Sequence, residues 1–235
     1  MDAAERIIVA LDGSPVEARN WARRLSGTAR WVKIGMTLFD ITGPSIVPEM
    51  HDLGFKVFLD LKLHDIPFQV EHAAEHLASL GVDLLTVHAF GGRSMMGAAV
   101  EGSRRGAEAE DKPAPHVLAV TVLTSANEGT MASIGINRPI IEQVELLARL
   151  AREACVHGVV CSPFEASMVR SILGTGADIV TPGVRPAGAS ADDQSRVATP
   201  AQALQNGATQ LVIGRPITQA ADPVAAFQAI LDEIA

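Results

Sequence analysis

The stretch Val57-Phe58-Leu59-Asp60-Leu61-Lys62-Leu63-His64-Asp65-Ile66-Pro67 predicts a buried strand, a short loop and the start of a helix. Side chains alternate between the two faces of a strand, so Asp60 and Lys62 point to the same side and the aliphatic residues to the other. Charges removed from water are costly unless they are paired, and these two can compensate each other. A structural ion pair is the alternative. Nothing structural requires an acid–base–acid cluster with Asp65 in an aliphatic run, so a functional site is favoured.

Strand-like and helix-like segments alternate along the rest of the chain. The predicted strands are continuous Val/Ile/Leu runs, as expected where both faces are buried; they cover 7–11, 31–35, 56–62, 84–89, 116–123, 158–161, 178–184 and 211–214. The predicted helices cover 15–25, 44–53, 67–80, 93–107, 140–154, 163–173 and 222–234. Eight strands alternating with helices predict an α/β fold, a (β/α)8 TIM barrel, in one domain over residues 1–235.

The composition limits the possible partners and compartments. A formal net charge of −8 argues against nucleic-acid binding. We find no signal-peptide pattern and no apolar run of about 18 residues, so we expect no membrane association. Cys155 and Cys161 show no disulfide or zinc spacing, which favours a reducing cytoplasmic location.

Polar residues fall where the predicted strands end. In a barrel of this kind the active site lies at the carboxyl ends of the strands. Lys33 and Lys62 are two of only four lysines, and both lie inside apolar runs. The residues expected at this rim are Asp12, Lys33, Asp60, Lys62, Asp65, Thr124, Ser125, Arg185, Gly214 and Arg215.

The last two strand–helix loops predict a phosphate site. Barrel enzymes often bind phosphate there with backbone N–H groups and a helix N-terminus. Gly214 permits close backbone approach, and Arg215 offers a bidentate fork. The long segment 186–196 is expected to act as a lid, with Arg185 and Gln194 touching the ligand. The alternative for Arg215 is a surface salt bridge. The alternative for Arg185 and Gln194 is that they are ordinary solvated loop residues.

At this point the sequence resembles bacterial orotidine 5′-phosphate decarboxylases. The resemblance rests on the string from Phe58 to Pro67, on Leu123-Thr124-Ser125, on the run from Thr181 to Arg185, on Asp193-Gln194 and on Gly214-Arg215. It covers nearly the whole chain in order, and the Asp-x-Lys-x-x-Asp core with both phosphate loops is specific.

The resemblance implies decarboxylation of orotidine monophosphate to uridine monophosphate without cofactor or metal. No spacing of two histidines and one carboxylate suggests a metal either. Lys62 would stabilise and protonate the carbanion at C6, Asp60 would lie beside the departing carboxylate, and Lys33 would extend the charge network to a ribose hydroxyl. Asp12 matches a ribose-binding position, Thr124 and Ser125 match the segment that meets the pyrimidine, and Arg185, Gln194, Gly214 and Arg215 match the phosphate site.

The resemblance also implies a homodimer with shared active sites. Asp65 would enter the neighbouring subunit's site, and Ile66 and Gln69 would also bind substrate. Phe68 and Gln69 depart from the Asn or Thr, then Thr, that bacterial relatives usually carry after the Ile-Pro pair. The cross-subunit contact of Gln69 is therefore open, whereas the charge network is intact.

Two other functions remain as alternatives. One is a metal-dependent sugar-phosphate decarboxylase or aldolase of the same barrel superfamily, against which Lys33 counts because such an enzyme would need a carboxylate there. The other is a non-catalytic nucleotide-binding barrel that retains the phosphate loops. Binding alone does not require a buried lysine between acids, and a turnover assay separates these possibilities.

Overall fold

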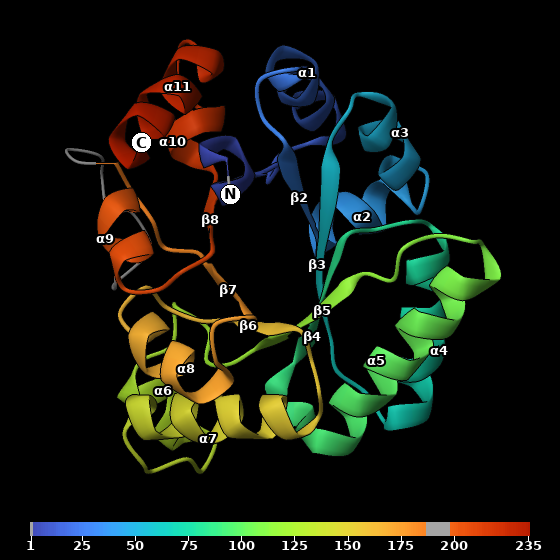
Figure 1. Cartoon of the computed structure of the whole chain (residues 1–235), viewed down its shortest axis with the longest axis vertical. Coiled ribbons are helices and arrows are strands. Elements are labelled where there is room, and N and C mark those ends of the chain that lie inside the picture. Colours follow the sequence, from blue (N-terminus) through green and yellow to red (C-terminus); the bar gives the residue numbers. More distant parts are fainter. Residues whose placement is uncertain (1, 187–197) are drawn as a thin grey trace.

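Eight parallel strands close into a barrel in chain order, and β1 pairs with β8 (Figure 1). The computed structural model describes residues 2–186 and 198–235. The strands are β1 (Ile7–Ala10), β2 (Trp31–Gly35), β3 (Lys56–Leu63), β4 (Leu84–His88), β5 (His116–Val120), β6 (Gly158–Val160), β7 (Asp178–Thr181) and β8 (Gln210–Ile213). The predicted (β/α)8 barrel is confirmed.

The helices form a ring outside the strands (Figure 1). The α-helices are α1 (Pro15–Leu25), α2 (Met36–Thr42), α3 (Ile46–Asp52), α4 (Pro67–Ser79), α5 (Gly92–Ala109), α6 (Glu128–Ser133), α7 (Ile140–Glu153), α8 (Ala166–Leu173), α9 (Pro200–Gln205), α10 (Arg215–Thr218) and α11 (Pro223–Ile234), with short 3-10 turns η1 (Ala3–Arg6) and η2 (Ala89–Gly91). None of the helices in these described ranges is long and apolar enough to span a bilayer.

The alternation of β3 side chains divides the core into two parts. Val57 and Leu59 pack in the large cluster between the strands and the helices. Phe58 packs inside the barrel with residues from other strands, including Leu84 and Leu118. The inward face that begins with Phe58 continues to Asp60, so the same periodicity that fills the barrel brings a carboxylate to its mouth.

Several element boundaries differ from the predictions. The strand expected over 178–184 ends at Thr181 because Pro182 has no N–H for the ladder and Gly183 adopts a φ of 78°. The strand expected over 116–123 ends at Val120. The helices over 44–53 and 163–173 begin two and three residues late, at Ile46 and Ala166. The short helices α2, α6, α9 and α10 were not predicted, since each is too brief to show a helical period.

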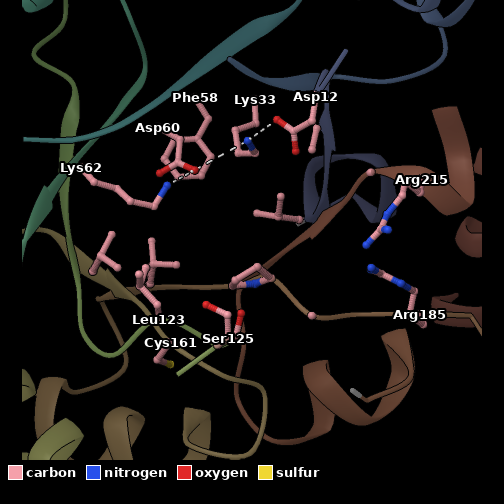
Figure 2. A pocket seen from close by; sticks show the side chains of 18 of the residues that line it. Asp12, Lys33, Phe58, Asp60, Lys62, Leu123, Ser125, Cys161, Arg185 and Arg215 are labelled. Carbon is pink, nitrogen blue, oxygen red and sulfur yellow. Dashed lines mark hydrogen bonds and ion pairs between the residues drawn. The ribbon is translucent and has the colours of Figure 1, made fainter. Parts of the chain in front are cut away.

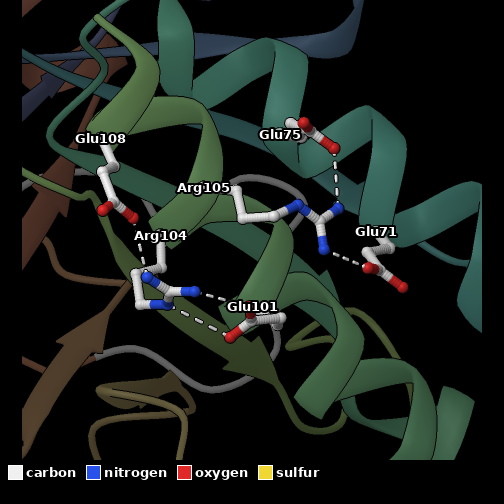
Figure 3. Close-up of polar contacts among 6 residues, drawn as sticks. All are labelled: Glu71, Glu75, Glu101, Arg104, Arg105 and Glu108. Carbon is white, nitrogen blue, oxygen red and sulfur yellow. Dashed lines mark hydrogen bonds and ion pairs between the residues drawn. The ribbon is translucent and has the colours of Figure 1, made fainter.

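Helices α4 and α5 approach each other unusually closely. An added Cβ on Gly102 or Gly106 of α5 would lie 2.0 or 1.9 Å from the backbone oxygen of Glu71 or Glu75 on α4. Arg105 spans the same contact, with its guanidinium 2.5 Å from the Glu71 carboxylate and 2.7 Å from that of Glu75 (Figure 3). The two glycines therefore set the distance between these helices.

Candidate active site

A cavity of about 490 Å³ opens at the carboxyl ends of the strands. Nine of the predicted site residues line it: Asp12, Lys33, Asp60, Lys62, Thr124, Ser125, Arg185, Gly214 and Arg215. Apolar side chains complete the wall, among them Phe58, Val122, Leu123, Val160 and Pro182. The structure thus brings these nine polar residues to one rim, without Asp65.

A chain of alternating charges runs along one side of the cavity (Figure 2). Lys62 Nζ lies 2.8 Å from Asp60 Oδ2, and Lys33 Nζ lies 3.7 Å from the same oxygen. Lys33 Nζ also donates to Asp12 Oδ1 at 2.9 Å. Each carboxylate contacts at least one ammonium, so the cluster compensates its own charges.

Asp60 is a buried acid, with only 9% of its surface exposed. Burial on its own would raise the pKa of Asp60, but the ammonium groups of Lys33 and Lys62 and the hydrogen bonds from Lys62 and Thr86 outweigh it. The pKa of Asp60 therefore lies below its ordinary value. The carboxylate stays ionised at neutral pH.

The backbone of Lys62 is in the left-handed region, with a φ of 54°. A non-glycine residue in this region is strained, and such strain is found at functional sites. The strain coincides with an irregularity in the sheet: Leu59 pairs with Leu85 and Leu63 with Val87, so three residues of β3 oppose the single residue Thr86 of β4. Lys62 lies in this bulge.

Arg185 and Arg215 lie at the end of the cavity away from Lys62, and their guanidinium groups point toward one another (Figure 2). Arg185 is only 6% exposed and donates to the Val184 carbonyl at 3.0 Å. Arg215 is the first residue of the short helix α10, directly after Gly214. Two facing guanidinium groups beside a helix start form a suitable environment for a phosphate dianion.

Three predicted residues do not line this cavity within one chain. Asp65, Ile66 and Gln69 lie on the surface where β3 leads into α4. The side chain of Ile66 is 62% exposed, and Asp65 accepts a hydrogen bond from the Ile66 N–H. Gln194 and most of the expected lid lie outside the described residues.

Thr86 was missed by the sequence analysis. Its hydroxyl lies 3.0 Å from Asp60 Oδ1 and 2.9 Å from the Lys62 nitrogen, and the residue is fully buried. The only signal was the inward position of Thr86 between Leu85 and Val87, which a buried threonine in any β-sheet would also show.

The acidic groups of the cavity are committed to lysines. Within residues 2–186 and 198–235, no three His, Cys, Asp or Glu side chains are arranged to hold a metal ion. Lys33 Nζ lies between Asp12 and Asp60, the two carboxylates that a cation would otherwise share. The arrangement is suited to electrostatic and proton-transfer chemistry by the lysines themselves.

Fold and site together define a (β/α)8-barrel enzyme with a buried lysine–carboxylate network at the mouth of the barrel. Residues 5–230 match the family described as orotidine 5′-phosphate decarboxylase / HUMPS. The chain belongs to this family.

Relatives match along nearly the whole chain. The orotidine 5′-phosphate decarboxylase of Moorella thermoacetica is 50% identical over 100% of this chain and 94% of that protein. The protein of the same name from Synechococcus is 47% identical over 98% of this chain and 96% of its own length. The crystal structure of orotidine 5′-phosphate decarboxylase from Lactobacillus acidophilus superposes with a TM-score of 0.85 at 37% identity, covering 98% and 99% of the two chains.

Proposed function

We propose that this chain decarboxylates orotidine 5′-monophosphate to uridine 5′-monophosphate, and that Lys62 is the residue that stabilises and protonates the C6 carbanion. The carrying observation is the position of Lys62 Nζ in the cavity, 2.8 Å from a buried carboxylate. Family membership and the names of the relatives support the substrate. We place the whole activity in a single domain over residues 1–235.

The chemical difficulty is a carbanion in the plane of the pyrimidine ring. Loss of CO2 from C6 leaves an electron pair that the ring π system does not delocalise well. A fixed ammonium stabilises this pair and then transfers a proton to it, forming the new C–H bond without a metal or cofactor. Asp60 keeps Lys62 pointing into the cavity. It also places a negative charge beside the substrate carboxylate, and the repulsion between the two carboxylates is relieved when CO2 departs.

The remaining polar residues would each bind a different part of the substrate. Lys33 and Asp12, joined at 2.9 Å, would bind the ribose hydroxyls. Thr124 and Ser125, which line the same cavity, would contact the pyrimidine. Arg185, Gly214 and Arg215 would hold the phosphate at the far end, with Gln194 of the lid over it. Binding energy from the phosphate is then available to orient the reacting ring.

A second cavity supports a homodimer with shared sites. This cavity of about 420 Å³ lies beside the first, shares Asp12, Lys33, Asp60 and Lys62 with it, and continues between apolar residues of α2 such as Met36 and Ile41. The exposed Asp65–Ile66 segment of a partner has the matching chemistry: a carboxylate for the ammonium groups and an aliphatic side chain for the apolar wall. Gln69 would follow on the first turn of the partner's α4.

We place the reaction in the cytoplasm. Neither Cys155 nor Cys161 is joined in a disulfide, which suits a reducing compartment.

Turnover is tested with purified protein and orotidine monophosphate, by following the change in ultraviolet absorbance. The proposal predicts uridine monophosphate as product and an unchanged rate after treatment with a chelator. Activity lost with chelator and restored by a divalent ion would favour the metal-dependent sugar-phosphate enzymes of the superfamily. Nucleotide binding without turnover would favour a non-catalytic barrel.

Replacing Arg215 by alanine is expected to weaken binding of the substrate more than it slows chemistry. A charge-assisted contact of this kind contributes about 1.5–3 kcal/mol, so KM should rise about 10- to 100-fold. Uridine, which lacks the phosphate, should bind wild type and variant equally. The measurement is KM together with the inhibition constants of uridine monophosphate and uridine, and an unchanged KM would remove Arg215 from the phosphate site.

Mixing two inactive variants tests whether sites are shared. Lys62→Ala and Asp65→Asn each damage both sites of their own homodimer. In a mixed dimer one site combines an intact Lys62 from one chain with an intact Asp65 from the other. Random reassociation should therefore restore about a quarter of wild-type activity. If Asp65 instead served its own chain's site, mixing would restore nothing.

A further inference from the structure

We infer that Thr86 is a positioning residue: its hydroxyl holds the Asp60 carboxylate and the Lys62 backbone in the arrangement that decarboxylation needs. This inference rests on the proposed function. It concerns a buried residue of β4 that does not line the cavity and would not touch the nucleotide.

The Thr86 hydroxyl connects the two members of the catalytic pair. It donates its proton to Asp60 Oδ1 at 3.0 Å, and it accepts the N–H of Lys62 at 2.9 Å. Asp60 uses its other oxygen, Oδ2, for the Lys62 ammonium. One hydroxyl group thus fixes the acid by its side chain and the lysine by its main chain.

The Thr86 hydroxyl accepts a backbone hydrogen bond at a point where the ladder between β3 and β4 is interrupted. Asp60, Leu61 and Lys62 all lie opposite Thr86, so the regular ladder between β3 and β4 is interrupted there. A buried N–H without an acceptor costs free energy. The Thr86 oxygen supplies the acceptor for Lys62 and so supports its left-handed backbone, which has a φ of 54°.

This geometry has two consequences for the reaction. Without the hydroxyl, the Asp60 side chain is no longer held in one orientation. The Lys62 ammonium then no longer has a carboxylate in a fixed position beside it. The Asp60 carboxylate also loses one of the hydrogen bonds that stabilise its ionised form, so its pKa should rise. Both effects act on chemistry at C6 and leave the distant phosphate contacts intact.

The test compares Thr86→Val, which keeps the shape and removes the hydroxyl, with Thr86→Ser, which keeps the hydroxyl. The valine variant should lose about 10- to 100-fold in kcat, with the affinity for uridine monophosphate unchanged. The acidic limb of its kcat/KM profile should move to higher pH. The serine variant should recover most of the rate and the wild-type profile. Thr86→Ala replaces the valine variant if the latter does not fold.

Thr121→Val is the matched control. Thr121 is equally buried, and its hydroxyl donates to the Val160 carbonyl at 3.1 Å, so this variant loses a hydrogen bond away from Asp60. It should keep the wild-type kcat and pH profile. If Thr86→Val also keeps both, or if serine restores nothing, the inference is overturned.

A titration by carbon-13 NMR of labelled aspartate separates this inference from the proposed function. The Asp60 resonance is assigned by its loss in Asp60→Asn, and its pKa should be higher in Thr86→Val than in wild type. This result does not need turnover. An inactive wild-type protein would contradict the proposed function alone, whereas an unshifted Asp60 pKa in an active enzyme would contradict the role of Thr86 alone.

Discussion

Lys62→Ala is expected to lose at least about 10⁴-fold in kcat, because it removes both a general acid and the charge that stabilises the carbanion. The ammonium is held 2.8 Å from Asp60, and the other ammonium of the network, on Lys33, is anchored to Asp12 at 2.9 Å. The Lys33 ammonium is therefore not available to take the place of the Lys62 ammonium. The variant should still bind uridine monophosphate with at most a few-fold change in affinity.

The matched control is Lys56→Ala at the opposite end of the same strand. Lys56 is half-exposed, pairs with Glu5 at 3.1 Å and lies outside the active-site cavity. Its removal should leave kcat unchanged and cost at most about 1 kcal/mol of stability. If Lys62→Ala kept more than about a tenth of the wild-type kcat, Lys62 could not be the proton donor.

Gly106→Ala is expected to destabilise the fold by about 1–3 kcal/mol, with a clear fall in the thermal midpoint. The new Cβ would lie 1.9 Å from the Glu75 carbonyl oxygen. That atom belongs to the backbone of α4, so no side-chain rotation relieves the clash and the helices must separate. Separation would also strain the Arg105 contacts to Glu71 and Glu75 (Figure 3).

Gly97→Ala on the same helix is the control. A Cβ on Gly97 meets no atom within 4 Å among the described residues. The substitution should therefore raise stability by up to about 1 kcal/mol through helix propensity alone. Thermal and denaturant unfolding measure both variants. If both substitutions changed the free energy of unfolding equally, the close contact between α4 and α5 at Gly106 would not require a glycine.

The fold could be predicted because the barrel has a simple sequence signature. Buried parallel strands are uninterrupted apolar runs, and long helices such as α7 show a clear period. Short elements escape this reasoning: α2 and α6 depend on tertiary packing of one buried residue each, Leu38 and Met131. Strand ends were misplaced where apolar residues continue past the ladder, as Val122 and Leu123 do.

The site could be predicted as far as charge and position allow. Strand alternation predicted that Asp60 and Lys62 share one face. The position of barrel active sites at the carboxyl ends of the strands predicted that Asp12, Lys33 and the two arginines lie close to them. Thr86 could not be found in this way, since its role depends on a bulge that changes the register between β3 and β4. The positions of Asp65, Ile66 and Gln69 in a shared site depend on a second chain and remain predictions.

The most direct test is a crystal structure of this protein with bound uridine monophosphate. The distance that matters joins Lys62 Nζ to C6 of the pyrimidine. A separation of about 3–3.5 Å, with Asp60 still paired to the lysine, is the predicted result. A nucleotide bound elsewhere, or a Lys62 side chain turned into solvent away from C6, would contradict the assignment of Lys62 as proton donor.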